Sequence, residues 1–476
     1  MQEPARIAID LGAESCRVSL LRWTGSQPSI EVIHRIPNGP VHRGKSMRWP
    51  LDSILAGLDE GLRKAALAAP EGIASIGADS WSVDYVRLAP DGRPLCEPFC
   101  YRDERTTPVK ETADAVLPPA QLFARSGVLP LRINTIYQLL ADPVGANADY
   151  VDPQAPWIML PEYVLYWLGG RRVAEYTNAS HTGLVSLQTR DWDPELFRLF
   201  DLPLEAAPPI VRAGTFLGRL QGPLAALPAF RDTQLIAPAT HDTASAVAGI
   251  PTTLDSTAYI CSGTWSLVGT LTNTSVTSQE AFEARYTNLG AATGDLCFHT
   301  LVNGMWLIKQ CMDAWSAEGR VWNIEDLIAQ AATSGFPGTI NVDAEPLLLD
   351  SDMPERINHQ LWLRRCNTIP DIAGNEPVFA RVIFESLAAR YASAIASLGG
   401  MLSRKLERIH ILGGASRNKL LTKLTEQRTG LPVENGQSES STIGNLAVQL
   451  AASEASGQPI TADSIRKCAA VLCQSE

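Results

Sequence analysis

The stretch RIAIDLGAESCRVSLLRW, residues 6–23, places two apolar runs on either side of a glycine turn. Short apolar runs around such a turn predict a β-hairpin. A second stretch, AYICSGTWSLVGTL at 258–271, repeats the pattern, with Ile9-Asp10-Leu11-Gly12-Ala13 aligned to Ile260-Cys261-Ser262-Gly263-Thr264. The repeat predicts two related domains joined in one chain, and a chance likeness between two glycine hairpins is the alternative.

Length and composition agree with two folded domains. The chain has 476 residues, which is more than one ordinary hydrophobic core accommodates. It is 45% apolar and 19% charged, as globular proteins are. Strand and helix patterns are mixed throughout, which predicts an α/β fold. Turn residues in GIPTTLDSTA, 249–258, mark a boundary, so we expect domains at 1–248 and 256–455.

Bulk charge and cysteine usage limit the partners and the compartment. The formal net charge of -11 disfavours nucleic acid and anionic membranes as partners, because both prefer a basic face. No window approaches about 18 uncharged apolar residues, and the N-terminus lacks the apolar core of a signal peptide. The nine cysteines are irregularly spaced, which predicts reduced thiols in the cytoplasm.

The C-terminal half contains the strongest helix pattern. RVIFESLAARYASAIASLGGML, 381–402, has apolar residues at helical spacing, and Gly399-Gly400 predict its end. ERIHILGGASRNKLLTKLTEQRTG, 407–430, predicts a strand, a Gly-Gly turn and a helix. That order is a common way to present a helix N-terminus to a phosphate or a nucleoside. The motif differs from the Rossmann fingerprint, and the chain has no P-loop sequence.

Three glycine turns are candidates for contact with a nucleotide. Asp10 ends an apolar run just before Gly12, where a carboxylate can face a metal-bound phosphate. Gly263-Thr264 offers N–H groups and a hydroxyl to phosphate oxygens, and Gly413-Gly414 could lie under a flat ring or a sugar. A turn-capping aspartate and ordinary tight turns are the alternatives.

Two polar segments are suited to a sugar. In ADSWSVD, 78–84, the carboxylates of Asp79 and Asp84 can accept hydrogen bonds from sugar hydroxyls, and the Trp81 face can cover sugar C–H groups. Solvated acids beside a core tryptophan are the alternative. In CYRDERT, 100–106, most charges are expected to form a salt-bridged loop, with Arg102 as the candidate ligand contact.

The segment IAPATHDTASAVAG, 236–249, places His241-Asp242-Thr243 between an apolar run and a run of small residues that suits a tightly packed helix. An aspartate at a strand end can remove a proton from a bound hydroxyl, and His241 could orient it or hold substrate. In the alternative, Asp242 caps the following helix, with Thr243 in its first turn. Both can be true at once.

Taken together, these segments resemble the FGGY family of carbohydrate kinases, and most of all its rhamnulokinase branch. The pairing of HDTASAV with SGTWSL is specific for this branch. The resemblance covers nearly the whole chain and keeps the order of the motifs, which are IAIDLGAESCRVSL, IGADSWSVDYVRL, YRDERT, NTIYQL, THDTASAVAGIP, YICSGTWSLVG, YTNLG, NGMWLIKQC, IHILGGASRNKLLTKLTEQRTGLPV and TIGNLAVQ.

The resemblance implies a fold, substrates and roles for individual residues. It implies two actin-like (ribonuclease H-like) domains with a cleft between them, which closes around a sugar on the N-terminal domain and ATP on the C-terminal one. It implies Asp242 as the catalytic base and Asp10 as the acid that faces Mg²⁺. The implied sugar contacts are His241, Thr243, Asp79, Trp81, Ser82 and Arg102. The implied nucleotide contacts are Gly12, Ala13, Arg17, Gly263, Thr264, Lys309, Gly413, Gly414 and Asn418.

The sequence departs from the family pattern at the sugar. Where rhamnulokinases have DTWGVD, this chain has Ser82 in place of the glycine, and Leu301 stands at a sugar-binding asparagine position. Lys309 replaces a glutamine on the nucleotide side. A site that lacks a hydrogen-bonding partner for a hydroxyl discriminates between sugars. We therefore expect a ketose kinase whose best substrate differs from L-rhamnulose, with L-fuculose, another deoxy-ketose or a pentulose as candidates.

Two other classes of function remain as alternatives. One is a sugar- or nucleotide-sensing protein that keeps the cleft without turnover, and the other is an actin- or chaperone-like ATPase without a sugar. The combination of Asp10, Thr264 and Asp242 favours the kinase, because a sensor need not keep a base. The expected partners are a sugar and ATP, and a homodimer is left open as the assembly.

Overall fold

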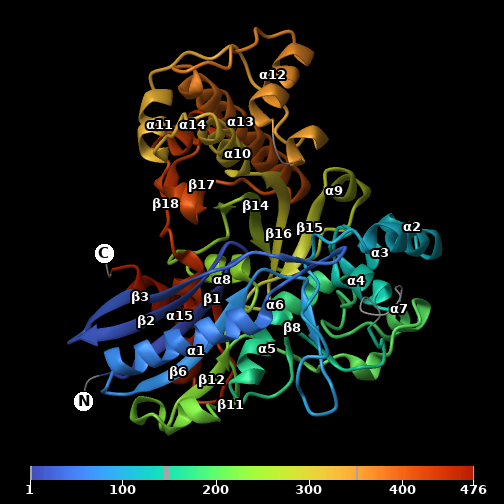
Figure 1. Ribbon diagram of the computed structural model, residues 1–476, viewed down its shortest axis with the longest axis vertical. Helices are drawn as coiled ribbons and strands as arrows, with labels where there is room; N and C mark the ends of the chain where they lie inside the picture. The colour runs from blue at the N-terminus through green and yellow to red at the C-terminus, as the bar shows by residue number, and fades with distance from the viewer. Residues whose placement is uncertain (1–2, 144–150, 350–351, 475–476) are drawn as a thin grey trace.

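The computed structural model describes residues 3–143, 151–349 and 352–474, which form two lobes, each built on a six-stranded sheet (Figure 1). The first sheet has the order β11-β12-β6-β1-β2-β3, with β11 (Thr215–Arg219), β12 (Gln234–Ala237), β6 (Ile73–Ser80), β1 (Ala5–Leu11), β2 (Ser15–Thr24) and β3 (Gln27–Pro37). The second has the order β15-β16-β14-β13-β17-β18, with β15 (Tyr286–Gly290), β16 (Leu296–Asn303), β14 (Trp265–Thr272), β13 (Thr257–Ser262), β17 (Arg408–Leu412) and β18 (Val433–Asn435).

The two glycine stretches form equivalent hairpins in the two sheets. In the first sheet β1 pairs antiparallel with β2 and parallel with β6. In the second, β13 pairs antiparallel with β14 and parallel with β17. The α/β class and the two actin-like domains are therefore confirmed, and the repeated hairpin marks the same place in each sheet.

The first sheet is buried on both faces, which explains the apolar run in β1. Successive side chains of a strand point to opposite faces. Ile7 and Ile9 pack with α1 (Leu51–Ala68) and α5 (Leu160–Trp167), whereas Ala8 packs with α15 (Ser440–Glu454) and α16 (Ala462–Leu472). Because Asp10 alternates with Ile9, its side chain leaves β1 on the same face as Ala8, toward α15.

Helices α2 (Thr106–Val116), α3 (Pro119–Ser126), α4 (Thr135–Ala141) and α7 (Pro194–Leu199) form a separate cluster on the right of the lower lobe in Figure 1. Tyr85, Trp157 and Trp192 lie at its centre, with their rings edge to face. This cluster lengthens the N-terminal domain without adding strands to its main sheet. It also supplies Thr135 and Gln138, which contact the candidate site described below.

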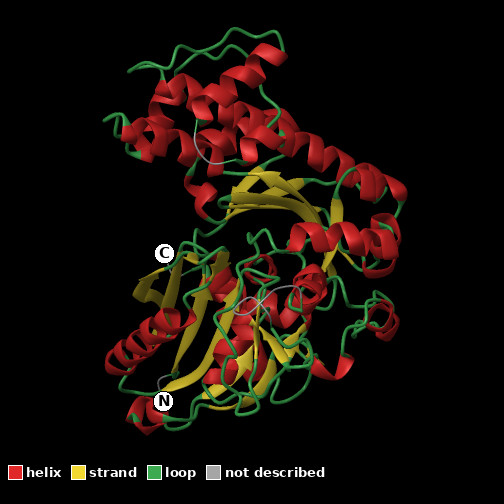
Figure 2. Ribbon diagram, turned by 45° about the vertical axis from the view of Figure 1, so that its right-hand side comes forward, coloured by secondary structure: helices red, strands yellow, loops and turns green. Residues whose placement is uncertain are grey.

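The upper lobe is a sheet covered by a helical layer (Figure 2). Its helices are α10 (Trp306–Ala317), α11 (Ile324–Ala331), α12 (Met353–Leu363), α13 (Glu376–Met401) and α14 (Lys419–Thr429). The prediction that α13 ends at Gly399-Gly400 is wrong, because the helix continues through both glycines. It ends near Ser403, which takes the left-handed conformation with φ 47°. Among the described residues, no helix is both long enough and apolar enough to cross a membrane.

The chain returns to the lower lobe after residue 439. The range 256–455 was expected to form the second domain, yet α15 within that range packs on β1 and β6 of the first sheet. Hydrogen bonds join α15 to β1: Arg6 donates to the Ser453 hydroxyl, and Gln449 donates to the Ile7 carbonyl. The domain limits along the sequence stay a prediction, while in space the upper lobe ends before α15.

Helix α15 makes its closest contact with α8 (Asp242–Ala248), the helix of small residues. Gly444 of α15 lies against the Ser245 carbonyl, and Gly249 lies against the Ser440 carbonyl. The run of small residues in α8 therefore does form a tightly packed helix, as its sequence predicts. This packing fixes the start of α8 relative to β1.

Replacing Gly444 with alanine would place a Cβ atom 1.7 Å from the Ser245 carbonyl oxygen. The Cβ position is fixed by the backbone of α15 and the oxygen belongs to the backbone of α8, so no rotamer change relieves the clash. We expect the free energy of unfolding to fall by more than about 2 kcal/mol. The control is Gly400→Ala in α13, where the new Cβ meets open space and helix propensity favours alanine by about 1 kcal/mol. Urea denaturation compares the two, and equal midpoints would contradict the close contact.

Candidate active site

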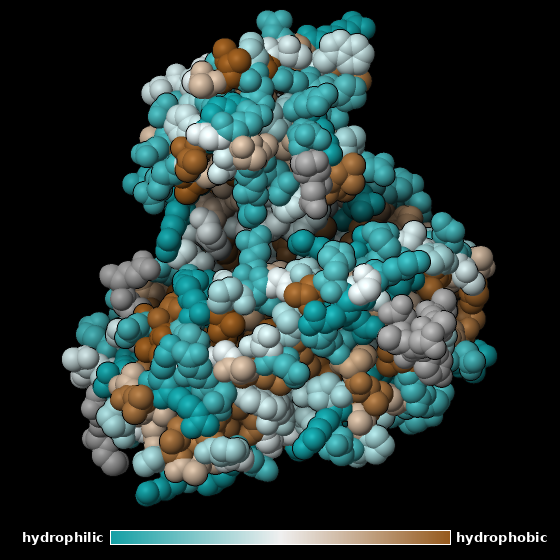
Figure 3. Space-filling model, viewed as in Figure 1, coloured by the Kyte–Doolittle hydropathy of each residue, from teal (hydrophilic) through white to brown (hydrophobic). Residues whose placement is uncertain are grey.

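A cavity of about 1350 Å³ lies between the two lobes and is lined by both (Figure 3). The lower lobe contributes the β1–β2 turn, the loop after β6 and the start of α8. The upper lobe contributes the β13–β14 turn, the β17–α14 turn and one side of α11 and α14. The predicted residues that line the cavity are Asp10, Gly12, Ala13, Arg17, Trp81, Ser82, Arg102, His241, Asp242, Thr243, Gly263, Thr264, Gly413, Gly414 and Asn418.

Of the residues singled out in the sequence, Asp79, Asp84 and Lys309 do not line this cavity. Asp79 lies next to Asp10 across the β1–β6 pair, and its fully buried carboxylate accepts a hydrogen bond of 2.6 Å from Asn445 of α15. Lys309 lies on α10 with 47% of its side chain exposed, paired with Asp313 at 2.9 Å. Asp79 and Asp10 leave their strands on the same face, but Asn445 of α15 covers the Asp79 carboxylate, and the helix face turns Lys309 toward solvent.

Asp10 and Arg17 form the charged end of the cavity. The Arg17 guanidinium donates to the Asp10 carboxylate at 2.6 Å, and Ser441 Oγ donates to the same carboxylate oxygen at 2.8 Å. Burial raises the pKa of Asp10, while Arg17 and Ser441 oppose that shift. Arg17 also contacts Glu439. Sequence reasoning missed Glu439 and Ser441, although a carboxylate in the serine-rich run SESS before a helix was the available signal.

Asp242 is the first residue of α8, and its side chain faces the cavity. His241 occupies the N-cap position without a side-chain cap, and Asp242 is the first residue of the helix, so the alternative in which Asp242 caps α8 is wrong. Asp242 Oδ1 accepts hydrogen bonds from the Thr243 backbone N–H at 2.5 Å and from the Thr243 hydroxyl at 3.2 Å. Burial raises the pKa of Asp242 to about 6. The carboxylate is therefore mostly ionised at neutral pH, and 39% of the side chain is exposed to the cavity.

His241 supports Asp242 as a neutral imidazole. Its Nε2 lies 3.3 Å from Asp242 Oδ1, and its ring centroid lies 4.0 Å from that of His181. Burial lowers the pKa of His241 to about 3. A neutral ring can donate one N–H group, so His241 can orient the carboxylate without forming an ion pair.

Asp84 supports the wall of the cavity that contains Trp81, which the sequence predicts to face the sugar. Its Oδ2 accepts hydrogen bonds from the indoles of Trp49 at 2.6 Å and Trp81 at 2.9 Å, and its Oδ1 accepts one from Gln138 at 3.0 Å. The two indole rings lie 4.2 Å apart. Both carboxylate oxygens of Asp84 are thus used by the protein, so Asp84 positions Trp81 instead of holding sugar hydroxyls. Asp84 does not line the cavity, whereas Trp81 does.

Val83, between Ser82 and Asp84, has a left-handed backbone with φ 74°. A β-branched residue in that region is a strained outlier, at a cost of about 1–3 kcal/mol. The Val83 carbonyl accepts hydrogen bonds from the Thr135 hydroxyl at 2.8 Å and from Gln138 at 3.2 Å. These bonds hold the strained turn, which places Trp81 and Ser82 at the cavity.

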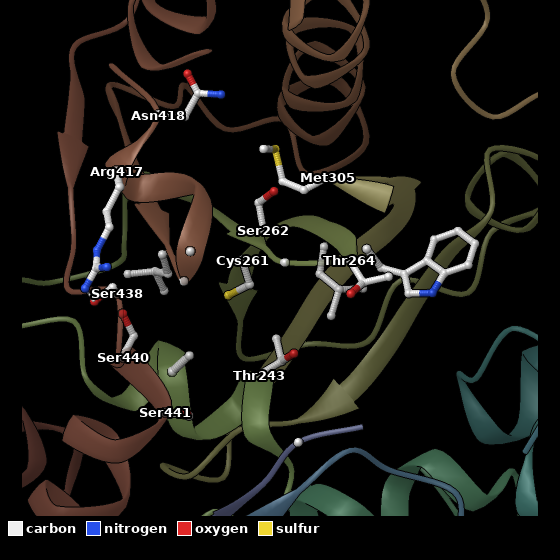
Figure 4. Close-up of a pocket in the computed structure, with 18 of the residues that line it drawn as sticks. Thr243, Cys261, Ser262, Thr264, Met305, Arg417, Asn418, Ser438, Ser440 and Ser441 are labelled. Atoms are coloured by element: carbon white, nitrogen blue, oxygen red, sulfur yellow. Dashed lines mark hydrogen bonds between the residues drawn. The ribbon is translucent and has the colours of Figure 1, made fainter. Parts of the chain in front are cut away.

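The upper lobe offers turns and a mostly apolar slot. Figure 4 shows Thr264, Met305 and Asn418 around the same space as Thr243 of the lower lobe. Asn418 caps α14 by accepting from the Leu421 N–H at 3.0 Å, and its buried Nδ2 has no hydrogen-bond partner. Beyond these turns, the cavity continues between α11 and α14, where its lining includes Ile328, Ala329, Ala332, Leu420 and Leu424.

Two buried glutamates, Glu162 and Glu175, support the backbone that precedes Asp242. Glu175 accepts from the Thr240 N–H at 3.0 Å, and Glu162 accepts from the Thr240 hydroxyl at 2.7 Å. The His241 N–H donates to the Thr177 hydroxyl, which itself contacts Glu175. Burial raises the pKa of each glutamate to about 7. The residues before Asp242 are therefore fixed by groups that the cavity does not expose.

The comparisons with known proteins agree with this geometry. Residues 5–249 match the N-terminal domain of the FGGY family of carbohydrate kinases, and residues 258–453 match its C-terminal domain. The chain belongs to this family. It is an ATP-dependent carbohydrate kinase, and FGGY kinases use ATP with Mg²⁺. The actin-like cleft, the kinase activity and the ATP substrate implied by the sequence resemblance are therefore confirmed.

Particular relatives narrow the comparison. A rhamnulokinase from Bacteroides thetaiotaomicron is 33% identical, over 93% of this chain and 89% of the relative. A rhamnulokinase from Pectobacterium carotovorum is 35% identical, over 94% of this chain and 88% of the relative. A gluconate kinase structure from Lactobacillus acidophilus superposes with a TM-score of 0.76 at 16% identity, over 99% of this chain and 97% of that one. At that identity the superposition shows the fold alone.

The two buried glutamates, Glu162 and Glu175, give a prediction for how stability depends on pH. Glu175 keeps its proton in the folded protein up to a pKa of about 7, whereas the ordinary pKa of a glutamic acid is 4.5. The folded state therefore binds more protons, and this group's contribution to the free energy of unfolding falls as pH rises from about 4.5 to 7. Glu175→Gln imitates the protonated form and should flatten that dependence in urea denaturation. Glu205→Gln, at an exposed site, is the control. An unchanged slope in Glu175→Gln would contradict the raised pKa.

Proposed function

We propose that this kinase phosphorylates a 6-deoxy-ketose and that Asp242 is its catalytic base. The observation that carries the proposal is the position of Asp242. Its carboxylate starts α8 at the wall of the cavity, partly exposed and with a pKa of about 6. A base with a pKa just below the working pH can accept a proton efficiently.

The residues of the cavity divide into two groups around Asp242. The turns at Gly12-Ala13 and Gly263-Thr264, with Arg17, offer N–H groups and positive charge to the phosphates. Trp81, Ser82, Arg102, His241 and Thr243 lie on the sugar side. The sugar hydroxyl oxygen forms a bond to the γ-phosphorus as the bond to the β-phosphate oxygen breaks. The hydroxyl proton passes to Asp242, and ADP leaves.

Asp10 fits the role of the acid that faces Mg²⁺. Its carboxylate lines the cavity beside the Gly12-Ala13 turn, and Mg²⁺ is commonly held by one or two carboxylates together with substrate phosphates and water. When bound, Mg²⁺ neutralises charge on the phosphate oxygens. In the protein alone, Arg17 and Ser441 hold the Asp10 carboxylate in place.

An apolar wall supports a deoxy-sugar. Leu301 of β16 pairs with Leu267 of β14, and both line the cavity. A carbon without a hydroxyl can pack on such a wall, whereas a hydroxyl there would lose its hydrogen bonds to water. The rhamnulokinase relatives point to the same class of sugar. The replacements at Ser82 and Leu301 still lead us to expect a best substrate other than L-rhamnulose.

We also place the kinase in the cytoplasm, where ATP is abundant. None of the nine cysteines, all of which lie in the described part of the chain, forms a disulfide, in agreement with a reducing compartment. The homodimer stays an open prediction.

Asp242→Asn tests the base. The variant keeps the size of the side chain and an acceptor for the Thr243 N–H, so we expect the affinity for ADP to stay within about twofold of the native value. Turnover should fall roughly 10²- to 10⁴-fold, the usual contribution of a positioned base. Steady-state kinetics and calorimetry measure the two quantities. Near-native turnover would remove Asp242 from the mechanism.

Matched sugars test the substrate class. L-rhamnulose and L-fructose differ only in the 6-hydroxyl, as do L-fuculose and L-tagatose. We expect kcat/KM to favour the deoxy member of each pair by about 10- to 100-fold, because a buried hydroxyl on an apolar wall lacks a partner. Equal rates would contradict the deoxy preference. A clear preference for L-rhamnulose over L-fuculose and pentuloses would contradict the expected change of substrate.

Two leucine variants, one at the cavity wall and one away from it, provide a matched comparison. Leu301→Asn should narrow the preference within each sugar pair, because the amide offers a partner to the 6-hydroxyl. Leu348→Asn changes an exposed leucine that does not line the cavity and should leave the preference unchanged.

A further inference from the structure

Glu439 belongs to a network of ion pairs with Asp10, Arg17 and Arg35. It lies immediately before α15, on the segment by which the chain returns from the upper lobe. Its carboxylate contacts the Arg17 guanidinium, and its Oε1 lies 3.3 Å from Arg35 Nη2. Arg17 in turn donates to Asp10 at 2.6 Å. One guanidinium is thus shared between two carboxylates.

The position of Glu439 is the place where a phosphate is expected. Glu439, Arg17 and Asp10 all line the cavity, together with the Gly12-Ala13 turn. An arginine guanidinium binds carboxylates and phosphates with the same planar pair of N–H groups. A carboxylate on Arg17 therefore uses the donors that a nucleotide phosphate would use.

The unequal burial of the two carboxylates around Arg17 favours the exchange of one of them for a phosphate. Its Nε is buried without a hydrogen-bond partner, so the terminal nitrogens carry the interactions of this side chain. The cavity-facing partner, Glu439, has 30% of its side chain exposed, whereas Asp10 has 4%. The more exposed ion pair is the weaker one in water, because solvent screens it. Glu439 is thus the partner that an incoming anion can replace at lower cost.

We propose that Glu439 is a positioning residue that occupies the phosphate-binding donors of Arg17 until the nucleotide arrives. In the empty cleft it keeps the guanidinium directed into the cavity and neutralised. When the nucleotide binds, Arg17 exchanges the Glu439 carboxylate for a phosphate oxygen, and Glu439 keeps Arg35 as its partner. Glu439 thus lowers nucleotide affinity and favours release of ADP. This inference rests on the proposed nucleotide site at Arg17.

Glu439→Gln tests the competition with metal-free ADP as the probe. Removing the negative charge while keeping the size frees Arg17, so the ADP dissociation constant from calorimetry should fall roughly tenfold. Glu434→Gln is the matched control, because Glu434 lies on β18 in the same connection, pairs with Arg408 and His410, and does not line the cavity. It should leave ADP affinity unchanged.

A double-mutant cycle shows whether the effect acts through Arg17. In an Arg17→Gln background, Glu439→Gln should no longer raise ADP affinity, because the shared partner is absent. Arg17→Met repeats the cycle with an uncharged side chain of similar length, in case the glutamine variant is unstable. An equal gain with and without Arg17 would overturn the proposal.

The remaining outcomes separate this inference from the proposed function. Unchanged or weaker ADP binding in Glu439→Gln, while Arg17→Gln weakens it, would overturn the competition and leave the nucleotide site in place. A lowered melting temperature with unchanged ADP affinity would make Glu439 only a link between lobes, which also overturns the proposal. If Arg17→Gln itself leaves ADP binding unchanged, the nucleotide site is wrong and this inference fails with it.

Discussion

The packing of α15 against the first sheet is the contact on which the site depends. This helix comes late in the sequence, yet it shares a core with Ala8 of β1 and meets α8 at Gly444. Because α15 touches both elements, it fixes the carboxyl end of β1 relative to the start of α8. Asp10 and Asp242 lie at those two ends. Ser441, in the first turn of α15, donates to Asp10 directly, and Glu439, just before the helix, is linked to Asp10 through Arg17.

The site concentrates groups whose burial opposes their charge. Burial raises the pKa of Asp10, of Asp242 and of the glutamates behind them, and it lowers the pKa of His241. At each position, the hydrogen-bond and ion-pair partners decide whether the group carries a charge. Asp10 has Arg17 and Ser441, so a charge is held there. Asp242 has the Thr243 donors and the neutral His241, which leave its carboxylate ionised yet basic enough to accept a proton.

Local patterns predicted the hairpin turns that line the cavity, because such turns depend on residues close together in the sequence. A glycine turn after a buried strand has the same geometry wherever it occurs, so the β1–β2 and β13–β14 hairpins and their cavity-facing residues could be read from the sequence. The family resemblance then placed Asp242 among them. The small residues of α8 likewise predicted close packing, since only short side chains permit a carbonyl to approach a neighbouring helix.

Side-chain direction and long-range partners were harder to predict. Asp79 and Lys309 match family positions, but Asn445 covers the Asp79 carboxylate and helix phase turns Lys309 toward solvent. The role of Asp84 depends on Trp49, which is distant in the sequence. The contact of Glu439 with Arg17 joins residues 422 positions apart, and no local pattern encodes such a pair.

The wall of the cavity is divided between the two lobes. Asp242, the proposed base, and Trp81 belong to the lower lobe, while Leu267 and Leu301 belong to the sheet of the upper lobe. Direct bonds such as Asn288 N–H to the Gly127 carbonyl, 2.8 Å, join the lobes beside the cavity. A substitution on the upper sheet can therefore alter the sugar contacts without displacing Asp242, whose position is set by α15 and the buried glutamates. Changes of substrate within this architecture should arise first at β14 and β16, where the backbone is secured by the sheet and the side chains are free to vary.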